Sequence, residues 1–313
     1  MYYYNFCGLK LASNKKLFLI NEETKDFNLK LNFSLLPKIF KFEKQLMKGE
    51  MYQSSIPFIN NQILVNIDNE KLYITDSETF LMDYDKSIRY VNIKVIEDDI
   101  TLFTKILVEV FFPLIFREEK IYPTHCMAFE YNKKIYIGFG DSGYGKSTLS
   151  AFLLKNGAKF ISDDTIYIKK ENDSLLINNG FNYISLWNQS ADNIYNISDG
   201  INKYGFNANK KMYEVNINKH LCNIWNKVDK ILYFERNNDI FDFRELSHYE
   251  LLIYFIKAQM QSFTMNRDDW EYLLSTLNEC SKNISFIKFN LKNGFDEIDL
   301  NCKNIFDYLE RSD

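Results

Sequence analysis

Several features that define common protein classes are scarce in this sequence. The 313 residues contain five cysteines, and no two of them form a C-x-x-C pair. An odd number without that spacing argues against a disulfide framework and against a zinc site. The formal net charge of −4 argues against a general nucleic-acid binder, which is usually basic. The cysteines are Cys7, Cys126, Cys222, Cys280 and Cys302.

The sequence also lacks a segment that would direct it to a membrane or anchor it there. Its first residues, MYYYN, have neither the basic region nor the apolar core of a signal peptide. The most apolar run, residues 106–116, contains Glu109 and Pro113 and is too short to span a bilayer. We therefore expect a cytoplasmic protein without a membrane or nucleic-acid partner, and homo-oligomerisation stays open.

Glycine is scarce as well, but it is concentrated in one place. Four of the eleven glycines lie between Gly138 and Gly145, and residues 140–148, GDSGYGKST, fit the pattern G-x-x-x-x-G-K-[ST]. Glycine allows the positive φ and the close approach that a phosphate-binding loop needs, and the backbone N–H groups of such a loop cradle phosphate oxygens. The pattern predicts that the phosphates of a ligand bind to Gly140, Asp141, Ser142, Gly143, Tyr144, Gly145, Lys146, Ser147 and Thr148.

The residues around this segment favour the phosphate-binding interpretation over an ordinary glycine-rich turn. Residues 133–139 are rich in aromatic and β-branched residues and predict a strand. Leu149, Phe152 and Leu153 lie on one face of a predicted helix, and Gly157 stands where that helix should end. In this context Lys146 would reach the β- and γ-phosphates and the hydroxyl of Ser147 would bind Mg²⁺.

The chain is expected to form two domains. Residues 1–100 predict a smaller, mostly β domain, with alternation at residues 27–33, a hairpin at 63–75 and a short helix at 35–47. This domain shows no catalytic pattern, so it either docks a substrate or has a packing role. Residues 101–313 predict an α/β catalytic domain, which an apolar helix at 101–118 joins to the first.

The second domain is expected to begin with a single strand at residues 122–130. Further strands are predicted at 159–162 and 230–235, and a pair of strands at 165–169 and 174–177 is joined by a turn at 171–173. Ser247 and Glu250 form the pattern of a capping box, which predicts the start of a helix. Another helix is expected around 270–277, followed by a strand at 284–291 and a terminal helix. Residues 178–211 predict an irregular, Asn-rich loop.

Acidic residues follow the strand at 159–162. Asp163 and Asp164 can provide oxygen ligands for Mg²⁺ and a base for an acceptor hydroxyl, or they can be solvated acids in a turn. His125, which directly precedes an apolar strand, is either a structural hydrogen-bonding residue or a site residue. We predict a metal site formed by Ser147, Asp163 and Asp164.

These motifs together resemble the HPr kinase/phosphorylase family, and more closely its relatives, the HPr-kinase-like serine kinases found beside lasso-peptide and other peptide-modification genes. That family has a histidine on the strand before the loop, a loop of the form G-x-S-G-x-G-K-S, a helix that ends near a glycine, and an Asp-Asp pair. Here these are His125, residues 140–147, Gly157 and the pair Asp163-Asp164. The spacing from the histidine to the loop is also similar.

The likeness extends to residues 180–187, GFNYISLW, which resemble a "pGyp…lkLW" stretch of the kinase-like relatives, and it covers roughly residues 120–190. It implies a phosphoenolpyruvate-carboxykinase-like P-loop fold and transfer of phosphate from ATP to a serine of a peptide or protein. It also implies that Lys146 binds phosphates, that Asp163 is the first choice for the base, and that His125 lies near the transferred phosphate.

One family feature is missing. The chain has no E-[IV]-R-G-x-G signature after the Asp pair, and residues 212–216, MYEVN, are the nearest equivalent. This argues against HPr as the substrate and against the reverse, phosphate-dependent dephosphorylation. Lys210, Lys211 or Arg236 could provide positive charge at the γ-phosphate, although each also fits a solvated surface. Two other functions stay open, a kinase of free serine or a sugar and a nucleotide-binding module that does not catalyse transfer.

Overall fold

The computed structural model describes residues 1–17, 19, 25–36, 50–55, 62–68, 70–76, 78–96, 99–141, 143, 145–179, 182–191, 194, 210–215, 221, 224–238, 240–259 and 264–311. The chain forms two compact units, one comprising Met1–Leu114 and Gln261–Met265, the other Ile115–Met260 and Asn266–Asp313. The fold is mixed α/β with a β-rich first unit, as the sequence predicts. The sequence predicts residues 101–114 as part of the second domain, but they belong to the first unit.

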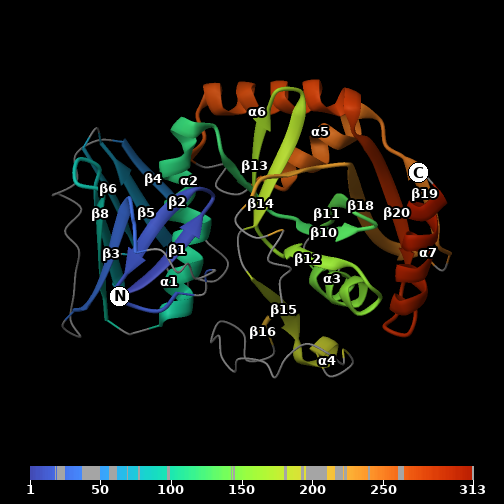
Figure 1. Cartoon of the computed structure of the whole chain (residues 1–313), viewed down its shortest axis with the longest axis horizontal. Coiled ribbons are helices and arrows are strands. Elements are labelled where there is room, and N and C mark those ends of the chain that lie inside the picture. The colour runs from blue at the N-terminus through green and yellow to red at the C-terminus, as the bar shows by residue number, and fades with distance from the viewer. Residues whose placement is uncertain are drawn as a thin grey trace. The chain divides into compact units, whose positions relative to one another are not determined.

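The first unit is built around one eight-stranded sheet (Figure 1). Its strands are β1 (Tyr2–Phe6), β2 (Leu9–Ser13), β3 (Leu29–Leu35), β4 (Glu50–Ser55), β5 (Gln62–Ile67), β6 (Lys71–Thr75), β7 (Phe80–Asp85) and β8 (Tyr90–Val95). They follow the order β1-β2-β3-β8-β7-β6-β5-β4. Alternation is clear in β3, where Leu29, Leu31 and Phe33 are buried and the residues between them are half-buried. Strands β5 and β6 pair antiparallel, which confirms the predicted hairpin.

The predicted apolar helix near residue 101 forms, but its winding changes along its length. It consists of α1 (Ile100–Ile106), a π-helical turn (Leu107–Phe111), α2 (Phe112–Phe116) and a 3₁₀ turn (Arg117–Glu119). Pro113 explains the wide turn, because proline has no N–H to donate and its ring clashes with a regular helical turn before it. The N–H of Phe112 accordingly donates to the carbonyl of Leu107, five residues back. In the first unit, Phe103 of α1 contacts Phe33 and Phe80 of the sheet.

In its described part, the second unit contains three sheets, five complete α-helices and two 3₁₀ turns, one at Arg117–Glu119 and one at Ser281–Asn283. Its strands are β9 (Tyr122–Thr124), β10 (Met127–Tyr131), β11 (Lys134–Phe139), β12 (Lys159–Ser162), β13 (Ile166–Glu171), β14 (Ser174–Asn179), β15 (Tyr183–Trp187), β16 (Lys210–Glu214), β17 (Asn226–Lys227), β18 (Lys230–Asn238), β19 (Asp242–Glu245) and β20 (Ser285–Lys292). Its helices are α3 (Lys146–Lys155), α4 (Asn188–Ala191), α5 (His248–Lys257), α6 (Arg267–Cys280) and α7 (Ile298–Arg311). The sheets have the orders β12-β10-β11-β18-β20-β19, β17-β14-β13-β9 and β15-β16.

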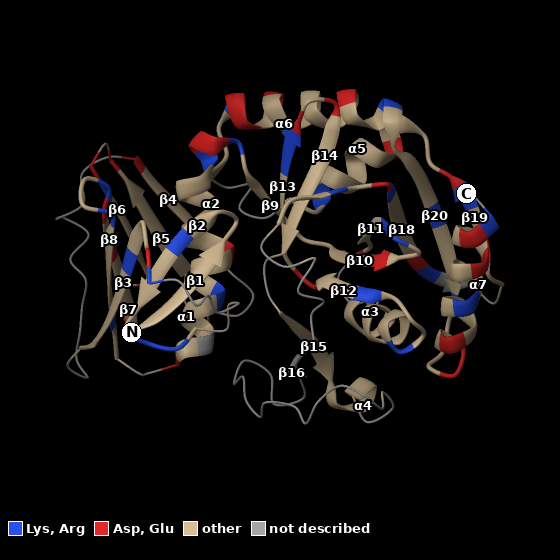
Figure 2. Cartoon of the chain, in the orientation of Figure 1, with Lys and Arg blue, Asp and Glu red and all other residues tan. Residues whose placement is uncertain are grey.

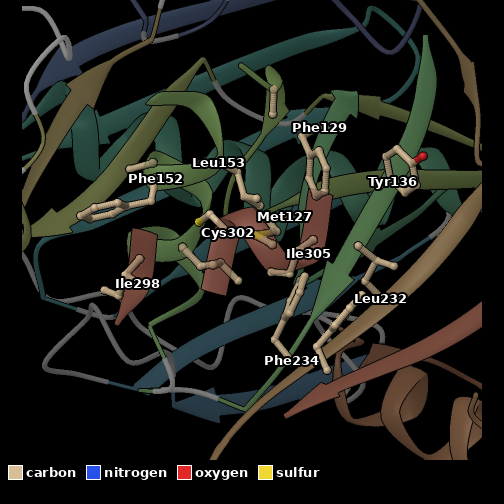
Figure 3. Packing of buried hydrophobic residues seen from close by; sticks show 14 of the residues in the cluster. Met127, Phe129, Tyr136, Phe152, Leu153, Leu232, Phe234, Ile298, Cys302 and Ile305 are labelled. Atoms are coloured by element: carbon tan, nitrogen blue, oxygen red, sulfur yellow. The ribbon is translucent and has the colours of Figure 1, made fainter. Parts of the chain in front are cut away.

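Helices cover both faces of the six-stranded sheet. On one face, Leu153 of α3 and Ile305 of α7 join Phe234 of β18 in a buried cluster, and Figure 3 shows these side chains converging between strands and helices. On the other face, Phe139 of β11 packs edge-on against Phe255 of α5, with ring centroids 5.9 Å apart. The sheet is therefore the middle layer of three.

Most charged residues of the helices lie on exposed faces, as α7 illustrates. Helix α7 buries apolar residues and carries acidic and basic residues on its exposed side, where Figure 2 shows the two signs interspersed. No described helix is both long and apolar enough to cross a membrane.

Two sequence predictions in this unit are wrong and one falls outside the described residues. Residues 122–130 form β9 and β10, two strands in different sheets, with a break at His125. The stretch 178–211, expected to be irregular, contains β15, α4 and the start of β16, and β15 pairs antiparallel with β16. The helix predicted at 35–47 lies almost entirely outside the described residues.

The capping box at the start of α5 is confirmed. The hydroxyl oxygen of Ser247 accepts a hydrogen bond from the backbone N–H of Glu250, and the Glu250 carboxylate accepts one from the N–H of Ser247 at 3.0 Å. Arg244 also donates to this carboxylate. The Arg244 contact and, secondarily, the Ser247 N–H lower the pKa of Glu250 to about 2.

We predict that Glu250→Gln destabilises the protein by roughly 0.5–1 kcal/mol near neutral pH, the usual size of a helix cap. Because the folded pKa lies below the unfolded value, the contribution is complete above about pH 4.5 and is lost as pH falls toward 2. Thermal unfolding of wild type and variant between pH 7 and pH 3 measures this. Glu271→Gln, which affects only an exposed pair with Arg267, serves as the control. A gap between wild type and Glu250→Gln that stays constant with pH would contradict the assignment.

Candidate functional site

The glycine-rich loop, residues 140–145, connects the end of β11 to the start of α3, as predicted. Gly143 and Gly145 have φ values of 86° and 80°, a region that glycine adopts without the strain of a Cβ atom. Gly145 immediately precedes the helix, and its carbonyl accepts the N–H of Leu149 at 2.8 Å. The first N–H groups of α3 therefore point toward the loop, which is the arrangement that binds anions. Ser142 and Tyr144 lie outside the described residues.

Strand β18 runs alongside this loop. It pairs in parallel with β11, Phe139 lying opposite Tyr233, and it continues beyond the end of β11. A Cβ atom on Gly140 would lie 2.7 Å from the backbone carbonyl oxygen of Phe234. Gly140 therefore lets the loop leave the strand in direct contact with the neighbouring backbone.

His125 and the acidic pair meet because the chain crosses twice between the same two sheets. It crosses from β9 to β10 at His125, and it returns from β12 to β13 at residues 163–165. Both strand pairs are antiparallel and in compatible register, with Thr124 opposite Ile166 and Ala128 opposite Ser162. The two crossings therefore face each other, and His125 Nδ1 lies 3.1 Å from Asp164 Oδ1.

The backbone holds both crossings in place. The N–H of His125 donates to the carbonyl of Ala258 at the end of α5, at 2.7 Å. Asp163 accepts through its backbone carbonyl from the N–H of Thr165 at 2.9 Å, which closes a tight turn. Asp164 within that turn has φ of 72°, a value that aspartate tolerates better than most residues. Asp163 is almost fully buried and Asp164 is half-buried, so the two carboxylates have different surroundings.

A cavity of about 270 Å³ collects most of the predicted site residues. Side chains and backbone from the loop, from the start of α3 and from both chain crossings line it, together with residues of β15, α4 and β18. The lining residues are His125, Gly143, Gly145, Lys146, Ser147, Thr148, Asp163, Asp164, Ser185, Trp187, Ser190, Arg236 and Phe295. His125, Lys146, Ser147 and the Asp pair are thus brought to one place.

Lys146 lies across the glycine-rich loop. Its Nζ donates to the carbonyl oxygen of Gly140 at 2.7 Å and approaches that of Asp141 at 3.3 Å. Burial lowers the pKa of Lys146, and the negative charges of Asp164 and Asp163 partly offset that effect. A phosphate oxygen is a stronger acceptor than a carbonyl, so this ammonium group is in place to transfer its hydrogen bonds to a ligand.

Two predicted ligand residues are placed differently from the rest. The Thr148 hydroxyl lies 3.0 Å from that of Ser190, in a buried contact that joins α3 to α4. Asp141 is exposed and is absent from the cavity lining, and its side chain contacts Tyr233 instead. Thr148 therefore reaches the cavity as part of its wall, while Asp141 lies on the outer side of the loop.

The structure places Arg236 at the site, where sequence reasoning gave it no more weight than Lys210 and Lys211. Arg236 lies on β18 and is half-buried, and its guanidinium group approaches the α-carbon of Gly145. Lys210 and Lys211 lie in β16, and their side chains are not among the described groups. The length of β18 is the sequence feature that could have identified Arg236. This strand extends past the end of β11 and so places Arg236 beside the loop.

The donor set suits a hard divalent cation. The Ser147 hydroxyl and the carboxylates of Asp163 and Asp164 line the same cavity and provide oxygen ligands only. Mg²⁺ takes such ligands and commonly combines one or two carboxylates with substrate phosphates and water. In the described part of the chain, no group of three or more His, Cys, Asp and Glu side chains forms a metal site. A magnesium site here would thus be completed by the phosphates of a substrate.

Comparisons with known proteins give structural likenesses only. No protein-family model matches the chain, and no curated protein matches it in sequence. Among solved structures, the chain is similar to the HPr(Ser) kinase/phosphatase from Coxiella burnetii, at 14% sequence identity and a TM-score of 0.31. The match covers 61% of this chain and 99% of that one. A TM-score of this size does not establish a shared fold, so the function is inferred from the site itself.

We predict that Gly140→Ala destabilises the second unit by roughly 1–3 kcal/mol, because the added Cβ would press against the backbone carbonyl of Phe234. Gly138→Ala is the matched comparison. There the added Cβ meets the ring of Phe234 and the side chain of Met127, which can change rotamer, so we expect a smaller loss. Chemical denaturation measures both. A Gly140→Ala protein at least as stable as Gly138→Ala would contradict the close approach of loop and strand.

Proposed function

We propose that the protein is an ATP- and Mg²⁺-dependent kinase that transfers the γ-phosphate to the serine hydroxyl of a peptide or protein. The observation that carries this proposal is the single cavity lined by His125, Lys146, Ser147, Asp163 and Asp164 beside a glycine-rich loop. Phosphoryl transfer requires a cradle for the donor phosphates, a cation, a base and positive charge on the transferred group. The lining residues supply side chains suited to each requirement.

Each residue has a defined part in this proposal. The loop N–H groups and Lys146 bind the donor phosphates, and Ser147 with one aspartate holds Mg²⁺, which neutralises phosphate charge when bound. Asp163 accepts the proton of the serine hydroxyl as the serine oxygen bonds to the γ-phosphorus and the bond to the departing ADP oxygen breaks. His125 positions Asp164 through their contact and lies near the transferred phosphate. The likeness of the motifs to peptide-modifying serine kinases supports a peptide acceptor.

The first test follows ADP release and phosphoserine formation, by coupled assay and mass spectrometry, with serine peptides as acceptors. Lys146→Ala should lower the transfer rate roughly 100-fold or more, because it removes a charge-assisted hydrogen bond to phosphate. Lys155→Ala, at the far end of the same helix, where Lys155 pairs with exposed Asp299 and lies over the ring of Phe152, should leave the rate unchanged. Transfer to free serine or a sugar alone would show a metabolite kinase. Nucleotide binding without transfer to any acceptor would refute the kinase function.

A second test separates the two carboxylates. Asp163→Asn should reduce kcat by roughly 10²–10⁴-fold, as expected for loss of a general base, while the Mg²⁺ concentration for half-maximal rate stays nearly constant. Asp164→Asn, which keeps a residue tolerant of positive φ, should mainly raise that Mg²⁺ concentration. The measurement is a magnesium titration of initial rates for each variant. The reverse pattern would exchange the two roles, and unchanged rates in both would remove the pair from the mechanism.

A further inference from the structure

We propose that Arg236 binds the inner phosphate of the nucleotide, the one that becomes the terminal phosphate of ADP, and stabilises the charge that develops on this leaving group. The inference rests on the proposed nucleotide site, and it assigns a second cation to that site besides Lys146. Four features carry it: the packing of the guanidinium group, the absence of a counter-charge among the described residues, its position relative to the carboxylates, and its place on the cavity wall.

The guanidinium group lies flat against Gly145. A Cβ atom built on Gly145 would be 3.1 Å from each of Cζ, Nη1 and Nη2 of Arg236. Equal distances to these three atoms place the glycine over the face of the guanidinium plane. The N–H bonds lie in that plane, so they point away from the glycine and can reach a ligand. Gly145 thus serves two purposes, since it adopts positive φ and leaves room for this contact.

Strand geometry fixes this position. Side chains alternate along a strand, so Arg236 lies on the same face of the sheet as Leu232 and Phe234, which pack against α3 and α7. Helix α3 begins next to Gly145 on that face. A register irregularity of the β18–β20 pair follows Arg236 directly, between Arg236 and Asn238. Such irregularities bend a strand and redirect its side chains, and they are common beside active sites.

Arg236 carries a charge that the described residues do not balance. Its Nε and Nη2 atoms are buried, and neither has a hydrogen-bond partner among the described residues. Burial lowers the pKa of the guanidinium group, and no carboxylate is among the groups that act on it. Buried N–H donors without acceptors are costly, so the two on Arg236, beside the proposed phosphate-binding loop, point to an anion that supplies the missing bonds. The fork of N–H groups matches phosphate oxygens particularly well.

The order of strands assigns the phosphate. In the sequence β12-β10-β11-β18, the loop follows β11, the Asp pair follows β12 and Arg236 lies on β18. The carboxylates and Arg236 are therefore on opposite sides of the loop. In an in-line transfer the acceptor and its base approach the γ-phosphorus from one side, and the leaving group departs on the other. Arg236 accordingly faces the inner phosphate, where negative charge increases as ADP leaves.

Calorimetric titration with ADP and with a non-hydrolysable ATP analogue tests the proposal. Arg236→Met should weaken both ligands by a similar factor, roughly 10–100-fold, the loss expected for a charge-assisted hydrogen bond. Arg236→Lys should recover part of the affinity, because it keeps the charge but not the planar fork. Arg244→Met, which removes an exposed arginine paired with Glu250, should leave both affinities unchanged. Thermal unfolding of each variant accompanies the titrations, and Arg236→Lys gives the readout if Arg236→Met does not fold.

The outcomes are distinct. Three results would each overturn the proposal. The first is unchanged affinity of Arg236→Met for both nucleotides, and the second is weaker binding of the ATP analogue alone. The third is an Arg236→Lys protein that loses as much affinity as Arg236→Met and also unfolds at a lower temperature. The second of these would place Arg236 at the transferred phosphate, and the third would give it a structural role. If the nucleotides bind in an Arg236-dependent way but no acceptor is phosphorylated, the kinase function fails, and of this inference only the binding of the inner phosphate stands. If wild type binds neither nucleotide, both fail.

Discussion

The site depends on a single constraint, the matched antiparallel register of β9 with β13 and of β10 with β12. The chain crosses between two sheets at His125 and crosses back at residues 163–165, and the register makes the two crossings face each other. Backbone hydrogen bonds hold both turns, including the bond from His125 to Ala258, and the Ser162 hydroxyl also donates to the carbonyl of Thr165 at 2.6 Å. Functional groups on such crossings are held rigidly, because moving them would require a shift in two sheets at once. The contact between His125 and Asp164 follows from this geometry.

The donor side of the site follows from a second pair of strands. Strand β18 lies parallel to β11 and extends beyond it, so that one strand leads into the glycine-rich loop while the other runs beside it. Glycines at the two ends of the loop make this possible, Gly140 against the backbone of Phe234 and Gly145 against the guanidinium plane of Arg236. Buried apolar residues of α3 and α7 pack against the strands that carry this loop. The proposed phosphate-binding loop and the packing of these strands are thus parts of one arrangement.

Local patterns in the sequence predict much of the fold around the candidate site. The strand before the loop, the helix after it, the hairpin of β5 and β6 and the capping box at Ser247 all depend on residues close in the chain. The stretch around His125 was read as one strand because its apolar residues are continuous, and only pairing with two different sheets divides it. Arg236 was underestimated for a similar reason, since its burial depends on a neighbouring strand far away in sequence. Patterns within a segment do not contain that information.

The most direct test of the account is a crystal structure of the protein with Mg²⁺ and a non-hydrolysable ATP analogue. The account predicts phosphates on the N–H groups of the glycine-rich loop, with Lys146 Nζ moved from the Gly140 carbonyl, which it now contacts at 2.7 Å, onto a phosphate oxygen. It also predicts the metal between Ser147 and the Asp163-Asp164 turn, with the terminal phosphate facing His125. An analogue bound elsewhere, or a loop in which Lys146 stays on Gly140 while phosphates bind outside the cavity, would contradict it.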